Sequence, residues 1–268
     1  MGEVYRNISW REGGLSRPKE VRQKEEWAAL KALQIDDALA GAHVVMANIK
    51  EMDFDWAGAE QEYKRALELD PNSVRAHETY AWHMEMLGRV DQAMPHLKRA
   101  QELDPLSLNI RWDIAVLFNF LRQYDRAIEQ FQKTTEMDAT FPPAHRGLAE
   151  TYQEKGMYEA AIAELKKANV SGAQLAYAYA VAGKSDEARK ILDDLQGLAK
   201  QPGRYVSPFD FALIYIGLGD KDQAFEWLNK TYEENPYRIG FLKVNPRFDS
   251  LRSDPRFTDL LRRMKLTA

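Results

Sequence analysis

Small and large apolar residues recur at a fixed period along most of the chain. Six anchor alanines are separated by 34, 34, 34, 27 and 36 residues, and a second alanine stands twelve residues before each anchor. A large apolar residue directly precedes each of these earlier alanines, and another follows each anchor by four positions. Because apolar positions three and four residues apart share one helix face, each unit is predicted to form two amphipathic helices. The anchors are Ala59, Ala93, Ala127, Ala161, Ala188 and Ala224, and the earlier alanines are Ala47, Ala81, Ala115, Ala149, Ala176 and Ala212.

Glycine and proline mark the ends of the predicted helices. Five residues before the anchor, four of the six units have glycine, whereas Phe54 and Arg122 are exceptions. Glycine suits this place because it adopts the left-handed conformation of a helix end at little cost. Prolines follow three anchors by twelve residues, at Pro71, Pro105 and Pro236, where we expect them to end the second helix. One such pair cannot bury its apolar face alone, so the pairs are predicted to stack.

This pattern of small and large residues, turn glycine and closing proline resembles the tetratricopeptide repeat at its 34-residue period. The resemblance covers residues 18–236, as a lone first helix followed by six units. It implies an all-α fold, a right-handed α-α superhelix of about six helix-turn-helix repeats with a C-terminal helical cap. Residues 1–17 form a predicted N-terminal arm, a candidate for disorder. The segment Gln201-Pro202-Gly203, inside the longest step, is the best candidate for a bend.

Residues 237–268 are predicted to form the cap. Asn245 and Asp254 are good N-cap residues, and each is followed by proline, which is favoured at the first helical position. An apolar stripe then follows that would cover the end of the sixth repeat, formed by Phe257, Leu260, Leu261 and Met264. Residues 36–236 carry 22 basic and 33 acidic side chains, and residues 237–268 carry eight and three. An acidic body argues against nucleic acid as the partner. The basic tail is interpreted as part of the cap, with a phosphate or acidic-partner site as the alternative.

Several site chemistries are excluded or unsupported. The chain has no cysteine, so disulfides, thiolate nucleophiles and cysteine-ligated metals are ruled out. His43, His77 and His145 occupy one repeat position and would lie a repeat apart, so we expect no metal site. The run at residues 183–185 imitates a phosphate-binding loop but lacks its earlier glycine and a preceding strand. We therefore expect no enzyme activity and no cofactor. No apolar stretch approaches the roughly 20 residues of a membrane helix, and a cytoplasmic location is expected.

The first helix of each unit carries the candidate binding surface. Positions fifteen, eleven and eight before the anchor share one helix face, which by the resemblance lines the concave groove of the superhelix. Aromatic side chains beside amides and charges are typical of a recognition surface. The alternative is that a tight superhelix or the cap covers them. The candidate groove residues are Asn48, Trp82, Glu85, Trp112, Val116, Asn119, Phe120, Arg146, Glu150, Tyr177 and Phe209.

The leading hypothesis is a non-enzymatic interaction scaffold that binds a peptide segment or a partner domain in this groove. Glu51, Glu78, Glu85 and Glu150 oppose an acidic ligand, so the predicted partner is basic or of mixed charge, with apolar anchors. No nucleic acid or membrane partner is expected, and both a monomer and a homodimer stay open. The chain is also similar to the C-terminal repeat regions of large bacterial regulatory proteins, where the solenoid often follows an effector domain. The alternative hypothesis is therefore a sensory or regulatory domain that binds a small ligand or controls a fused effector.

Overall fold

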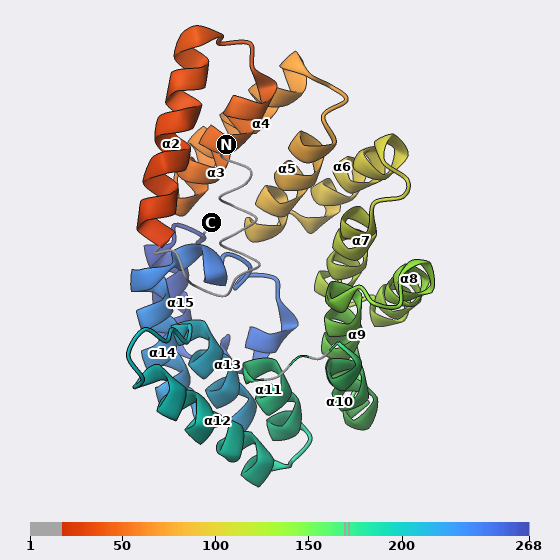
Figure 1. Ribbon diagram of the computed structural model, residues 1–268, viewed down its shortest axis with the longest axis vertical. Coiled ribbons are helices and arrows are strands. Elements are labelled where there is room, and N and C mark those ends of the chain that lie inside the picture. Colours follow the sequence, from red (N-terminus) through yellow and green to blue (C-terminus); the bar gives the residue numbers. More distant parts are fainter. Residues whose placement is uncertain (1–17, 169, 171, 268) are drawn as a thin grey trace. The chain divides into compact units, whose positions relative to one another are not determined.

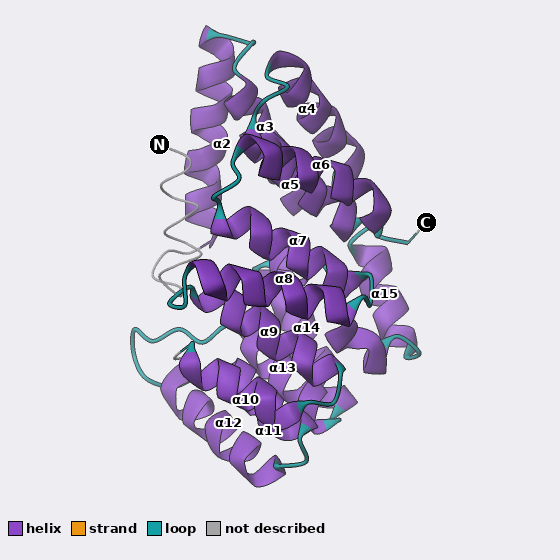
Figure 2. Cartoon of the chain, turned by 90° about the vertical axis from the view of Figure 1, so that its right-hand side faces the viewer, coloured by secondary structure: helices purple, strands orange, loops and turns teal. Residues whose placement is uncertain are grey.

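The structure, a computed structural model, describes residues 18–168, 170 and 172–267. All regular elements within this part of the chain are helices (Figures 1 and 2). The predicted N-terminal arm, residues 1–17, lies outside the described residues. The chain divides into two compact units. Unit 1 comprises Met1–Pro105 and Glu234–Tyr237, and unit 2 comprises Leu106–Glu233 and Arg238–Ala268.

Unit 1 contains one unpaired helix followed by two helix pairs. The unpaired helix packs on the first helix of the first pair, and the two helices of each pair pack on each other. The second helices end two residues before Pro71 and Pro105, as the sequence predicts. The helices are α2 (Pro18–Ile35), α3 (Ala40–Met52), α4 (Trp56–Leu69), α5 (Val74–Met86) and α6 (Val90–Leu103).

Unit 2 contains four further helix pairs and the C-terminal helices. Within it, α7, α9 and α11 each pack on the second helix of their own pair, and α13 packs on α11. The pairs are α7 (Leu108–Phe120) with α8 (Tyr124–Met137), α9 (Pro142–Glu154) with α10 (Tyr158–Lys167), α11 (Ala173–Val181) with α12 (Ser185–Ala199), and α13 (Pro208–Leu218) with α14 (Lys221–Glu234). The C-terminal elements are the 3₁₀ helices η1 (Pro236–Ile239) and η2 (Pro246–Leu251) and the helix α15 (Pro255–Arg263).

The twelve alanines of the repeat pattern are all fully buried. They lie in the first and second helices of the six pairs, where a small side chain permits close approach of the two backbones. The apolar residue four positions after each anchor is buried as well, and Tyr63 and Phe131 are the largest of these side chains. The period read from the sequence therefore specifies the packing within each pair.

The turn between the helices of a pair has the same backbone conformation whether or not it contains glycine. Gly88, Gly156, Gly183 and Gly219 have positive φ angles, as predicted. Phe54 and Arg122, the two exceptions in the sequence, adopt φ angles of 55° and 59°. A side chain in this left-handed region costs about 1 kcal/mol relative to glycine. Phe54 and Arg122 thus adopt the same turn conformation as the glycines. The presence of a side chain at these two positions therefore needs a separate explanation.

The helix starts predicted near the C-terminus are confirmed. The side chains of Asn245 and Asp254 accept hydrogen bonds from the backbone two residues on, and so cap η2 and α15. α15 packs on α14, because the Arg256 guanidinium lies 4.4 Å from the centre of the Phe225 ring and Arg263 makes the same contact with Tyr232 at 4.1 Å. The first of the two predicted helices is a 3₁₀ helix rather than an α-helix.

Histidines at one repeat position connect the two helices of three pairs, and two of them bind a glutamate of the second helix. His43 Nδ1 lies 2.6 Å from Glu62 Oε2, and His145 Nδ1 lies at the same distance from Glu164 Oε2. Their Nε2 atoms lie 3.0 and 2.9 Å from backbone carbonyls six residues earlier. Burial raises the pKa of Glu62, but hydrogen bonds from His43 and Lys50 outweigh it and hold that pKa below its usual value. These histidines are therefore elements of the repeat, which agrees with their spacing.

The second repeat has a histidine, His96, where the first and fourth repeats have glutamate. His77 Nε2 lies 3.1 Å from the Pro71 carbonyl, and His77 Nδ1 lies 2.9 Å from His96 Nδ1. The carbonyl accepts only from Nε2–H, so the neutral His77 ring uses Nδ1 to accept a hydrogen bond from His96. Burial lowers the pKa of His96, and the charge of His77 lowers it further. Protonation of His96 is consequently unfavourable in the folded state.

We expect the contribution of His96 to the stability of unit 1 to be lost as the pH falls below the ordinary histidine pKa of about 6.5, because the unfolded state then binds this proton more readily than the folded state. Replacing His96 with glutamate creates a third histidine–carboxylate pair and should reduce this loss. Urea unfolding across the pH range measures the effect, with His96→Gln as the control that removes the imidazole without adding a carboxylate. An unchanged pH dependence in His96→Glu would contradict the role given to the histidine pair.

Candidate functional site

A segment near the C-terminus, residues 239–252, lies against the first helices of unit 2. We call it the C-terminal segment. It contacts one side chain from each of α7, α9, α11 and α13, and these four residues were all predicted from the sequence to bind a partner. They define the unit 2 face, which consists of Phe120, Glu150, Tyr177 and Phe209.

Arg247 is the central charged residue of the C-terminal segment. Its side chain is only 8% exposed, and its Nη2 lies 3.0 Å from Glu150 Oε1. The guanidinium carbon lies 5.2 Å from the centre of the Tyr177 ring, within the range of a cation–π contact. Burial raises the pKa of Glu154, on the same helix as Glu150, although the charge of Arg247 opposes this rise. The carboxylate and the aromatic ring offset part of the cost of burying this charge, while Arg247 Nε and Nη2 make no hydrogen bond to the residues described.

Aromatic contacts on either side of Arg247 complete the attachment. The rings of Phe248 and Phe209 meet edge to face with their centres 6.4 Å apart, and Phe248 is almost fully buried. The rings of Phe241 and Phe120 lie 5.5 Å apart. Aromatic pairs at these separations contribute about 1 kcal/mol each beyond the area that they bury. The C-terminal segment thus binds through one cation between two aromatic anchors.

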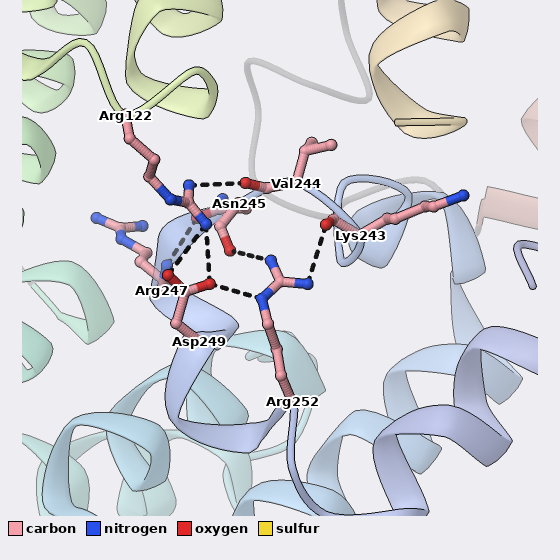
Figure 3. Close-up of polar contacts among 7 residues, drawn as sticks. All are labelled: Arg122, Lys243, Val244, Asn245, Arg247, Asp249 and Arg252. Atoms are coloured by element: carbon pink, nitrogen blue, oxygen red, sulfur yellow. Dashed lines mark hydrogen bonds and ion pairs between the residues drawn. The ribbon is translucent and has the colours of Figure 1, made fainter. Parts of the chain in front are cut away.

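Arg122, at the turn between α7 and α8, also binds the C-terminal segment (Figure 3). Its Nη1 donates to the Val244 carbonyl at 2.9 Å, and its Nη2 donates to both carboxylate oxygens of Asp249 at 2.9 and 3.0 Å. Charge-assisted bonds of this kind are stronger than neutral ones. This contact gives a reason for a non-glycine residue at the turn position.

Arg252 organises the C-terminal segment internally. Its Nε donates to Asp249 at 2.6 Å, and its terminal nitrogens donate to the backbone carbonyls of Lys243 and Asn245 (Figure 3). Asp249 therefore accepts from two arginines, one in the segment and one in the α7–α8 turn. We call Arg122, Asp249 and Arg252 the latch.

The other candidate residues of unit 2 lie on α7 and α9. Trp112, Val116 and Arg146 are half-buried, and Asn119 is buried. Trp112 Nε1 and Asn119 Oδ1 are buried atoms without a hydrogen-bond partner in the described part of the chain. These polar atoms would gain hydrogen bonds from a ligand that reached them.

The candidate residues of unit 1 are Asn48, Trp82 and Glu85, on α3 and α5. Asn48 Oδ1 accepts a hydrogen bond of 2.8 Å from the Tyr63 hydroxyl, and Trp82 is half-buried. Glu85 is 2% exposed, and burial raises the pKa of its carboxyl well above the ordinary value. Its Oε1 has no hydrogen-bond partner among the residues described.

Comparison with family models identifies the repeats. The model of the tetratricopeptide repeat matches residues 52–115 and 121–174, and a second model of the same repeat matches residues 209–237. The chain belongs to the tetratricopeptide repeat family. The family that the small and large residues predict, and with it the all-helical fold, is thereby confirmed. A comparison with curated proteins finds no match.

Solved structures show the same fold at low sequence identity. A tetratricopeptide repeat protein from Parabacteroides merdae has a TM-score of 0.62 and 14% identity, over 98% of this chain and 96% of that one. The anaphase-promoting complex hetero-tetramer Cut9–Hcn1 has a TM-score of 0.60 and 15% identity, over 91% of this chain and 46% of that one. PilW, a type IV pilus biogenesis factor, has a TM-score of 0.52 and 17% identity, over 91% and 97%.

Among the described residues, no three histidine, aspartate or glutamate side chains are grouped so that they could hold a metal ion. None of the described helices has the length and apolar character needed to cross a membrane.

Arg122, Arg247 and Asp249 are site residues that were not predicted from the sequence. Arg122 was noted only as a departure from the turn glycine. The sequence offered one signal for Arg122, because four other repeats have glycine at this turn position and a charged side chain there is unusual. Nothing in the sequence indicated that Arg247 would reach Glu150, which lies 97 residues earlier in the chain.

Proposed function

We propose that this tetratricopeptide repeat protein is a non-enzymatic interaction scaffold that binds a segment of a partner protein on its first helices. One observation carries the proposal: the unit 2 face already holds a segment of the chain through a buried arginine and two aromatic anchors. Solenoid repeats provide extended, preformed binding surfaces of this kind, and little ordering cost then falls on the receptor.

The same contacts indicate the chemistry of the partner. Arg247 meets Glu150 and Tyr177, so this face accepts a cation flanked by apolar side chains. A basic or mixed-charge partner with apolar anchors therefore fits the unit 2 face better than an acidic one.

Trp82 and Trp112 are proposed as the principal anchors, because large aromatic side chains near the centre of an interface contribute most of the binding energy. Replacing both with alanine is expected to weaken partner capture by about a hundredfold, since each truncation costs more than 1 kcal/mol. The measurement is quantitative mass spectrometry of proteins retained from a lysate by the immobilised full chain and by the variant.

Trp27→Ala is the matched control for this experiment. Trp27 lies on α2, is 65% exposed and belongs to none of the candidate positions. The control should retain the same proteins as the wild type, and circular dichroism should show equal helicity in all three chains. The single variants Trp82→Ala and Trp112→Ala then assign the partner to unit 1 or to unit 2. Equal capture by the double variant and the wild type would refute the anchor assignment.

A further inference from the structure

We propose that the C-terminal segment is an internal ligand of the unit 2 face, and that the external partner replaces it with the succession arginine, aromatic residue, aspartate. This inference rests on the proposed function and specifies the partner of one of its surfaces. The segment presents these three side chains consecutively, as Arg247, Phe248 and Asp249.

Each of the three side chains has its own receptor on unit 2. Arg247 pairs with Glu150 and lies over Tyr177. Phe248 packs on Phe209. Asp249 receives two hydrogen bonds from Arg122. These receptors come from α9, α11, α13 and the α7–α8 turn, so a short peptide would contact four successive repeats. A motif with both charges in this order satisfies the face, whereas reversal of either charge places like charges together.

The C-terminal segment is held mainly by side chains rather than by its own backbone. Its regular element is the six-residue 3₁₀ helix η2, and helices of this type have poorer hydrogen-bond geometry than α-helices. The latch is accessible to water, because the side chains of Arg122 and Asp249 are 36% and 47% exposed. Exposed ion pairs are weak and are screened by salt. The latch is therefore the point at which a competing ligand or salt loosens the segment.

The segment can leave without loss of the helices that flank it. α15 has its own attachment to α14, in which Arg256 Nη1 lies 2.7 Å from Asp222 Oδ1 and Arg263 Nη1 donates to Asn229 at 2.6 Å. The end of the C-terminal segment that leads into α15 thus stays anchored when the segment is displaced, and displacement exposes Leu242 and Leu251, which are buried in the folded chain. A tethered segment of this length competes as an intramolecular ligand with a high effective concentration. Wild-type chain is therefore expected to resist an external copy of the motif.

The test uses the full chain with Arg247→Ala and Phe248→Ala, which weakens the internal ligand and leaves the unit 2 face intact. A fluorescent peptide with the sequence of residues 243–252 is titrated into this variant and into the wild type, and binding is followed by fluorescence anisotropy. The peptide is expected to bind the variant about tenfold or more tightly than the wild type, because the internal competitor is weakened. No binding to a variant with native helicity would overturn the proposal.

Two control peptides define the specificity. The peptide with the same two substitutions should not bind. The chain also offers a matched control in residues 252–261, which contain Pro255, Arg256 and Phe257 but have Thr258 in place of the aspartate. This peptide should bind about tenfold more weakly, since it lacks the group that meets Arg122. Equal binding of the peptides of residues 243–252 and 252–261 would overturn the arginine, aromatic residue, aspartate motif.

A second measurement on the wild type keeps the proposal testable if the variant fails to fold. Hydrogen exchange of amides in residues 242–251 should be about tenfold less protected than in α9 and α11, and excess peptide of residues 243–252 should accelerate it further. Equal protection of the segment and these helices would overturn displacement. If the peptide fails while capture by the wild type still depends on Trp82 and Trp112, the internal ligand is refuted and the scaffold function stands.

Discussion

Replacing Gly147 with alanine is expected to lower the free energy of unfolding of unit 2 by about 3 kcal/mol. Gly147 lies in α9, where a β-carbon would come 2.2 Å from two ring carbons of Phe131 in α8. The Phe131 ring is fully buried, so it cannot turn into solvent to make room. Either the two helices separate or the ring leaves its preferred rotamer, and both disturb a close-packed interior.

Gly197→Ala is the matched control, because it makes the same change within a helix of unit 2. No atom lies within 4 Å of the position that its β-carbon would occupy in α12. Alanine has the higher helix propensity, so this variant should be more stable by up to about 1 kcal/mol. Urea unfolding followed by circular dichroism measures both variants. Similar effects of the two substitutions would show that the contact with Phe131 does not limit packing.

The fold could be predicted from the sequence because the helix pairs are specified locally. Ala115 and Ala127, for example, lie twelve residues apart in α7 and α8, and both are fully buried where the helices meet. Their roles depend on contacts within a pair, and the same contacts recur at a period of about 34 residues. A repeated local rule can be found in one sequence without any alignment.

The site could be predicted only on the side of the first helices. Glu150, Tyr177 and Phe209 were found because their positions follow from the repeat, whereas Phe120 was predicted although it lies seven residues before its anchor, outside those positions. The segment that contacts them does not belong to the repeat, so its register was not available from any period. Arg122 and Asp249 are separated by 127 residues, and no local pattern pairs them. For these four residues of unit 2, the contacts with the C-terminal segment agree with the alternative that the cap covers them.

Departures from the repeat pattern are informative because the altered residue costs stability that the usual residue would not cost. Arg122 adopts a left-handed conformation that glycine would adopt more easily, and its side chain binds Val244 and Asp249. His96 stands where the first and fourth repeats have the carboxylates of Glu62 and Glu164. Burial lowers the pKa of His96. Such residues identify the places where a repeat has acquired a specific contact.

The contact between Glu51 and His83 is the strongest candidate for a polar interaction that stabilises unit 1. His83 Nδ1 lies 2.9 Å from Glu51 Oε1, and both side chains are almost completely buried. The imidazole lies among aromatic rings, with ring centres 5.4 Å from Tyr63 and 6.0 Å from Trp56. Replacing His83 with alanine is expected to lower the free energy of unfolding by about 4 kcal/mol, since a buried carboxyl then loses its imidazole partner and a cavity forms.

His77→Ala on the same helix is the control, since its partner His96 is another histidine and its ring is half-buried. It should cost about 1 kcal/mol. Glu51→Gln retains an oxygen acceptor for His83 and should also cost about 1 kcal/mol. Because Glu51 lies on α3 and His83 on α5, the contact joins the first helices that carry Asn48 and Trp82. His83→Ala should therefore weaken partner capture through unit 1 as well as stability, and equal urea midpoints for His83→Ala and His77→Ala would contradict this role.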